Sequence, residues 1–220
     1  MRKVKKKNLY AACCCLGAFV LWTLAVCYMD VQPIGPRGSL VGFAAVNRFV
    51  HSLTGVNLVL YTITDWLGLV PVLMAMGFAV HGLVQWIRRK NLLQVDYPIL
   101  ALGVFYLVVM AAYLFFELVV INYRPVLIEG RLEASYPSST TMLVMCVLLT
   151  AGMLFNSYIK NRWWKRCAAA VIYGFAAFMV VGRLVSGVHW FSDIIGGALL
   201  SAGLVKLYAS VSGLESSVVI

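Results

Sequence analysis

Six long apolar runs are the feature that most constrains how this chain can fold. A helix needs about 20 apolar residues to cross the hydrocarbon core of a bilayer, and every run is close to that length. In lipid, a helix is the only open-ended element that satisfies its own backbone hydrogen bonds. The runs lie at residues 9–29, 66–86, 97–121, 141–158, 167–185 and 191–208. We therefore predict an all-α, polytopic membrane protein with six transmembrane helices in a single domain, 1–220.

The charge pattern indicates lipid rather than nucleic-acid partners. The chain carries a net charge of +10, yet only 12% of its residues are charged and 62% are hydrophobic. Its cations stand in short clusters between the apolar runs, which is typical of membrane topology rather than of nucleic-acid binding. We expect membrane lipids as partners, no nucleic acid, and no cofactor. The sequence does not indicate an oligomeric state.

The first apolar run follows a basic start, as the apolar part of a signal peptide does. It is too long for that part, and no small-residue cleavage pattern follows it, so we predict a retained span. After it comes a segment rich in proline and glycine and then a short amphipathic stretch, 41–53, predicted to lie in the membrane interface. The six cysteines lie in or beside apolar runs and are predicted to be small buried hydrophobes, with palmitoylation near the N-terminus as the alternative.

Lysine and arginine divide unevenly between the two sides of the predicted bundle. Thirteen of the 18 fall on one side, which holds the basic N-terminus, the loops around Arg88 and Lys160, and Lys206. The five on the other side are Arg37, Arg48, Arg124, Arg131 and Arg183. Because cytoplasmic loops carry the excess of cations, both termini are predicted to be cytoplasmic. The small chain is typical of a multi-pass protein of a bacterial plasma membrane.

Ionisable residues at membrane depth are costly, so each is a functional candidate. Six lie inside or at the ends of the spans, all near the predicted outer face: Asp65, Glu117, Arg124, Arg183, His189 and Asp193. A structural cluster of ion pairs is the alternative. Asp65 either lines the pocket that these residues would form or caps its helix. His51 is predicted to be an interfacial polar residue and His81 a structural one.

The sharpest local signal lies between Gly182 and Asp193. His189 and Asp193 are four residues apart at the start of the last span, so a helix places them on one face. A carboxylate beside an imidazole fixes its tautomer and leaves the other ring nitrogen as a base or nucleophile. Arg183 adds a forked cation suited to phosphate oxygens. The combination favours catalysis over a purely structural histidine.

Two upstream segments extend this predicted site. Arg124 and Pro125 follow the third span, and Ser138, Ser139 and Thr140 open the fourth. Serine hydroxyls and free backbone N–H groups at the start of a helix bind anions, although they also serve as plain helix caps. Together with two arginines and a histidine, they indicate a phosphate-binding site without a metal.

These segments resemble the three motifs of the PAP2 (type 2 phosphatidic acid phosphatase) superfamily, which are Lys-x6-Arg-Pro, Pro-Ser-Gly-His and Ser-Arg-x5-His-x3-Asp. The resemblance covers about residues 97–208 and implies a PAP2-like helical bundle. The residues that match are Arg124, Pro125, Pro137, Ser138, Arg183, His189 and Asp193. Those that depart are Glu117 for the lysine, Ser139 for the glycine, Thr140 for the histidine and Gly182 for the leading serine.

The resemblance implies roles for these residues. His189 would attack phosphorus to form a phosphohistidine, and Asp193 would orient it. The phosphoryl oxygens would be held by Arg124, Arg183 and the turn at Ser138 and Ser139. The expected function is therefore a lipid phosphatase or phosphotransferase acting on a polyprenyl pyrophosphate or a phosphatidate at the outer face. The alternative is a catalytically silent relative that binds or moves a phosphorylated lipid.

Three hypotheses compete for the two main departures. Seven residues make about two helical turns, so Glu117 is expected to face Arg124 and to serve as a replacement acid. Alternatively, the leaving group is good enough to need no acid, since Thr140 cannot act as one. In the third hypothesis, hydrolysis has been lost.

Overall fold

The computed structural model describes residues 2–214. Met1 and residues 215–220 of the predicted single domain lie outside the described part, as do the side chains of Arg2 and Lys3. Within it, six helical segments are long and apolar enough to cross a membrane, which confirms the predicted all-α, six-span fold. They are α1 (Arg2–Tyr28), α3 with α4 (Leu58–Leu67 and Leu69–Arg89), α5 (Tyr97–Leu118), α6 (Ser139–Tyr158), α7 (Arg162–Val185) and α8 (Phe191–Ser212).

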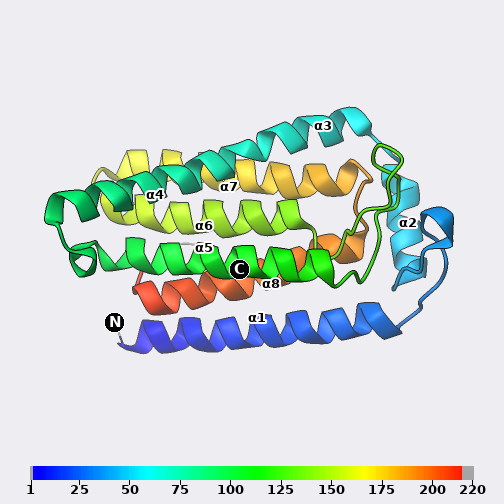
Figure 1. Ribbon diagram of the computed structural model, residues 1–220, viewed down its shortest axis with the longest axis horizontal. Coiled ribbons are helices and arrows are strands. Elements are labelled where there is room, and N and C mark those ends of the chain that lie inside the picture. Colours follow the sequence, from blue (N-terminus) through cyan, green and yellow to red (C-terminus); the bar gives the residue numbers. More distant parts are fainter. Residues whose placement is uncertain (1, 215–220) are drawn as a thin grey trace.

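The long helices run side by side, and α2 (Ala44–Thr54) lies across one end of them (Figure 1). Helices α6 and α8 form the centre of the bundle, and α1 packs along α8 on the outside. Small residues permit these close contacts. A Cβ on Gly203 of α8 would lie 2.7 Å from the Leu16 side chain of α1, and one on Gly196 would lie 2.6 Å from Tyr136.

Two spans differ most from the sequence prediction, both at the end of the bundle that carries α2. The second begins at Leu58 rather than at residue 66, because the Asn57 side chain caps the helix by accepting a hydrogen bond from the Leu60 N–H at 2.9 Å. Asp65 therefore lies two turns inside the span instead of at its end. The third span ends at Leu118 rather than at residue 121, so Arg124 belongs to the loop that leads to α6.

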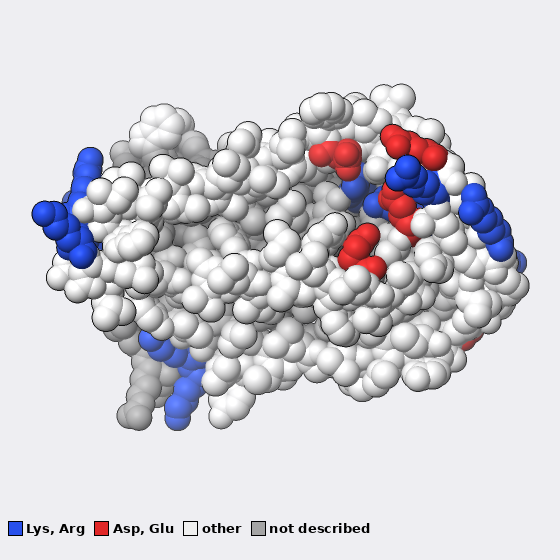
Figure 2. Space-filling view, in the orientation of Figure 1, with Lys and Arg blue, Asp and Glu red and all other residues white. Residues whose placement is uncertain are grey.

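Figure 2 shows how the charged side chains are distributed on one face of the molecule. Basic side chains stand at one end, a wide uncharged belt follows, and acidic and basic side chains together surround a hollow near the other end. That second end is the one that carries α2 and the loop between α5 and α6 (Figure 1). The uncharged belt agrees with a bundle surrounded by lipid.

The prediction that the cysteines are buried is wrong for most of them. Cys146 in α6 is buried, whereas Cys13, Cys14 and Cys27 are exposed on α1. The physical reason is the peripheral position of α1, which turns only one face toward α8 and leaves the rest for lipid. An apolar run in a membrane protein thus does not distinguish residues that face the bundle from residues that face the bilayer.

Candidate active site

The short connection between α7 and α8 carries His189. Gly187 in this loop has a φ of +68°, and a Cβ there would lie 1.8 Å from the carbonyl oxygen of Gly55. Only glycine fits such a position, because an L side chain would be both strained and in collision. The loop is therefore held tightly against the C-terminal end of α2.

Asp193 is locked in place beside His189. Its side chain is fully buried, with Oδ2 accepting from the Trp190 N–H at 2.9 Å and Oδ1 accepting from Asn122 Nδ2 at 3.1 Å. Nδ1 of His189 lies 3.9 Å from Oδ2 of Asp193, slightly beyond hydrogen-bond distance. A small movement of the imidazole would close this pair, whereas the carboxylate has little freedom.

Two asparagines that the sequence prediction missed complete this network. Asn122 donates to Asp193, and Asn47 exchanges two hydrogen bonds with Ser192, at 2.9 Å through Oγ and 3.0 Å through the backbone N–H. Both asparagines are buried, and a buried amide requires such partners. The sequence signal that could have found them is an asparagine in a short apolar stretch near the motifs. No local pattern, however, indicates that their partners are Asp193 and Ser192.

Arg183 is almost fully buried and is held on several sides. Its Nη2 donates to Thr140 Oγ1 at 2.7 Å and to Asp65 Oδ1 at 3.2 Å, and Nη1 lies 3.4 Å from Thr64 Oγ1. The guanidinium carbon lies 4.8 Å from the centroid of the Tyr61 ring, a cation–π contact. Asp65 thus pairs with Arg183, and Asn57 rather than Asp65 caps the start of α3.

Arg124 approaches the same place from the loop between α5 and α6. It is mostly buried, its Nε lies 3.1 Å from Oε2 of Glu133, and its guanidinium carbon lies 6.0 Å from the centroid of the Tyr61 ring. Tyr61 therefore lies near both arginines. This tyrosine on α3 was also missed, because the predicted second span began after it.

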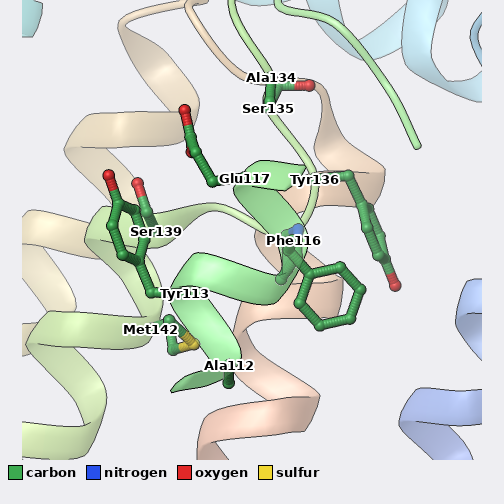
Figure 3. Close-up of a pocket in the computed structure, with 10 residues that line it drawn as sticks. Ala112, Tyr113, Phe116, Glu117, Ala134, Ser135, Tyr136, Ser139 and Met142 are labelled. Atoms are coloured by element: carbon green, nitrogen blue, oxygen red, sulfur yellow. The ribbon is translucent and has the colours of Figure 1, made fainter. Parts of the chain in front are cut away.

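The prediction that Glu117 faces Arg124 is wrong. It assumed that one helix carries both residues, but α5 ends at Leu118 and Arg124 pairs with Glu133 instead. Glu117 lines a small neighbouring pocket together with Tyr113 and Ser139. In Figure 3 its carboxylate and the two hydroxyl groups lie toward one side, away from the Tyr136 ring.

The three hydroxyl side chains at the start of α6 have different surroundings. Ser138 is fully buried; its Oγ accepts from the Thr141 N–H at 3.4 Å, and its own N–H donates to the Asp193 carbonyl at 3.0 Å. Ser138 thus joins α6 to α8, and Ser139 lies in the Glu117 pocket. Thr140 is the residue of this group that contacts Arg183, so the structure brings Thr140, rather than the two serines, to this arginine.

Several nitrogen atoms at this site have no partner among the described residues. They are Nη1 of Arg124, Nε of Arg183 and both ring nitrogens of His189. A buried donor without a hydrogen bond costs about 1–3 kcal/mol, so such a cluster is unfavourable unless a ligand completes it. Two guanidinium groups beside an imidazole are suited to the oxygens of a phosphoryl group.

We predict that His189 is neutral at physiological pH. Burial, opposed by Asp193 and reinforced by Arg124 and Arg183, lowers the pKa of His189 to about 4. Since the depressed pKa lies below the ordinary value near 6.5, protonation should appear only as the pH falls well under 6. The ¹⁵N NMR titration of histidine-labelled protein checks this, because the chain has only three histidines. A His189 midpoint near 6.5, assigned with His189→Gln, would contradict the prediction.

The fold and the site define a multi-pass helical membrane protein in which a buried His–Asp pair meets two arginines. A family model described as the PAP2 superfamily matches residues 104–215 of the 220. The chain therefore belongs to the PAP2 superfamily, which confirms the resemblance of its motifs.

Among solved structures, the chain is similar to the first transmembrane PAP2 type phosphatidylglycerolphosphate phosphatase from Bacillus subtilis. The TM-score is 0.60, and the match covers 91% of this chain and 94% of that one. The sequences are 15% identical, so this likeness shows the fold alone. No curated protein matches the chain.

Proposed function

We propose that this protein hydrolyses or transfers a phosphoryl group of a membrane lipid, with His189 as the nucleophile at the outer face of a plasma membrane. The observation that carries the proposal is the convergence of unpaired nitrogens from His189, Arg124 and Arg183 in one buried place. Membership of the PAP2 superfamily supports the phosphatase class.

In the proposed first step, a ring nitrogen of neutral His189 attacks phosphorus, and the bond from phosphorus to the leaving oxygen breaks. Since Asp193 stands next to Nδ1, Nε2 is the attacking atom. Arg124 and Arg183 stabilise the charge on the phosphoryl oxygens. In the second step, the oxygen of water or of an acceptor hydroxyl group attacks phosphorus, the bond from phosphorus to Nε2 breaks, and the proton of the attacking group passes to solvent.

An apolar groove supports a lipid substrate over a soluble phosphate. The groove has a volume of about 560 Å³, its walls come from α4, α5 and α6, and it reaches Ser139 and Thr140. Thr140 also accepts a hydrogen bond from Arg183, so the groove ends beside the proposed phosphoryl site. A phosphate bound by the arginines would leave an attached apolar chain free to lie between these helices.

One observation favours a second function, binding of a phosphorylated lipid without hydrolysis. Thr140 stands where the superfamily motif has the histidine that protonates the leaving oxygen, and its hydroxyl accepts from Arg183. A threonine hydroxyl is not an acid at neutral pH, so a poor leaving group would depart slowly. The arginines would still bind the phosphate.

The two functions are separated by phosphate release from purified protein in lipid nanodiscs. Substrates should include polyprenyl pyrophosphates, phosphatidate and phosphatidylglycerophosphate, each with and without an added lipid alcohol as acceptor. The proposal predicts turnover of at least one of them. Saturable binding without release or transfer, in protein with an intact thermal transition, would instead support the binding function.

Thr140→His is expected to raise turnover of phosphatidate by about tenfold or more, because a positioned general acid contributes about 10²–10⁴-fold. A pyrophosphate should gain less, since its leaving phosphate needs little protonation. Thr140→Val is the matched control; it removes the same hydroxyl without adding an acid and should give no gain. Equal effects of both variants on both substrates would show that leaving-group protonation is not limiting.

A further inference from the structure

Helix α2 lies outside the part of the chain that the family model matches, yet it contacts the loop that carries His189. The model match begins at residue 104, whereas α2 spans Ala44–Thr54. In Figure 1 α2 crosses the end of the bundle instead of running along it. Helix α2 therefore lies across the ends of the spans, with one face against the bundle and the other face exposed.

The inner face of α2 holds the loop between α7 and α8 at both of its ends. At the start of the loop, His51 Nε2 lies 3.1 Å from the Gly187 carbonyl oxygen. At the start of α8, Asn47 makes its two hydrogen bonds to Ser192. Because a carbonyl oxygen only accepts, the proton of neutral His51 must be on Nε2.

Two further contacts extend the same attachment. The Asn57 N–H, just beyond α2, donates to the Ser186 carbonyl at 3.0 Å. The His51 ring also lies against the ring of Trp190, with 5.4 Å between centroids. The segment from Asn47 to Asn57 therefore contacts the chain on both sides of His189: at Ser186 and Gly187 before it, and at Trp190 and Ser192 after it.

The outer face of α2 is apolar and exposed. Val46, Phe49 and Leu53 recur at helical spacing and are 47%, 64% and 70% exposed. A helix of this kind, lying across the ends of membrane spans, has the properties of an interfacial helix that buries its apolar face among lipids. Its place across the ends of the candidate membrane spans agrees with a location at the depth of the head groups.

We propose that α2 acts as a clamp: lipid anchors its apolar face, and its other face positions the loop between α7 and α8 that carries His189. His51 is then a positioning residue for His189. The outer leaflet holds the apolar face of α2, and the inner face holds the loop through His51 and Asn47. The position of the imidazole relative to the arginines then depends on lipid contact made by α2. The catalytic consequence rests on the proposed function, whereas the structural coupling can be measured without any turnover.

His51→Ala and His51→Gln test the clamp. Glutamine can still donate to the Gly187 carbonyl, so His51→Gln should retain kcat within about twofold. His51→Ala should lower kcat by about tenfold with little change in KM, because a small misplacement of reacting groups is costly. The ¹⁵N signals of His189 should shift or broaden in His51→Ala and return toward wild type in His51→Gln. Ser52→Ala, on the exposed side of the same helix, is the control and should change neither signal nor kcat.

The lipid contact is tested by Phe49→Ser combined with Leu53→Ser. In vesicles, this variant should lower kcat and should move the His189 signals in the direction seen for His51→Ala. A higher KM with unchanged kcat and unchanged His189 signals would mean that the apolar face only gathers substrate, and would overturn the clamp.

The NMR measurement separates this proposal from the proposed function. If wild-type protein releases no phosphate but the His189 signals respond to His51→Ala, the proposed function fails and the coupling stands. If His189→Gln abolishes turnover while His51→Ala changes neither kcat nor the signals of His189, the proposed function stands and the clamp is wrong.

Discussion

Replacing His189 with glutamine is expected to lower turnover of the phosphorylated lipid by about 10³-fold or more, because removing a nucleophile removes the covalent route itself. Glutamine has a similar size and can occupy the same buried position without carrying a nucleophilic nitrogen. The measurement is phosphate release in nanodiscs under single-turnover and steady-state conditions. Binding of the substrate should change much less than kcat, since both arginines remain.

The matched control for this variant is His81→Gln. His81 lies on α4 and accepts a hydrogen bond from Gln85 at 2.9 Å, in a separate polar cluster with Asp96 and Arg89. Turnover in this variant should stay close to wild type. When the reaction of wild-type protein with labelled substrate is quenched, labelled phosphate should remain bound to the protein. This protein-bound phosphate should be stable to base and labile to acid, as expected for a phosphohistidine. Undiminished turnover in His189→Gln would rule out His189 as the nucleophile.

Asp193→Asn is expected to reduce kcat by about 10²–10⁴-fold, because a carboxylate next to an imidazole holds its tautomer and stabilises its charged form. The structure adds a second reason. Asn122 donates to Oδ1 of Asp193, and the Trp190 N–H donates to Oδ2. An asparagine amide offers only one acceptor oxygen, so one of these two donors would face an NH₂ group.

The effect of this variant on folding can be separated from its effect on chemistry. Losing one buried hydrogen bond should cost about 1–3 kcal/mol, visible as a lower thermal midpoint but not as loss of the folded state. The ¹⁵N shifts of His189 should show a changed tautomer population. If kcat falls less than tenfold while the thermal midpoint drops, Asp193 serves mainly to hold α8 and its loop in place.

The arrangement of the arginines shows why part of the site could not be predicted. Arg183 and Arg124 were recognised from their motifs, but their carboxylate partners, Asp65 and Glu133, come from different segments. The expectation that Glu117 faces Arg124 was wrong for a local reason, because it placed both residues on one helix, whereas α5 ends at Leu118. Where a helix ends in a membrane protein depends on how the following loop folds over the bundle, and hydropathy does not record this.

The six spans and the His189–Asp193 pair were determined by the sequence itself. The thickness of the bilayer sets the length of an apolar run. The spacing of four residues indicated the pair, although His189 lies in the loop just before α8 and only Asp193 lies in the helix. Both are local rules that need no knowledge of the rest of the chain.

The partners of that pair were decided only by the tertiary structure. Asn122 lies 71 residues from Asp193, and Asn47 lies 145 residues from Ser192. Tyr61 meets two arginines that two different segments supply. Contacts of this kind arise because helix packing brings distant polar groups into a volume without water, where each must find a partner. No local pattern in the sequence specifies which partner that is.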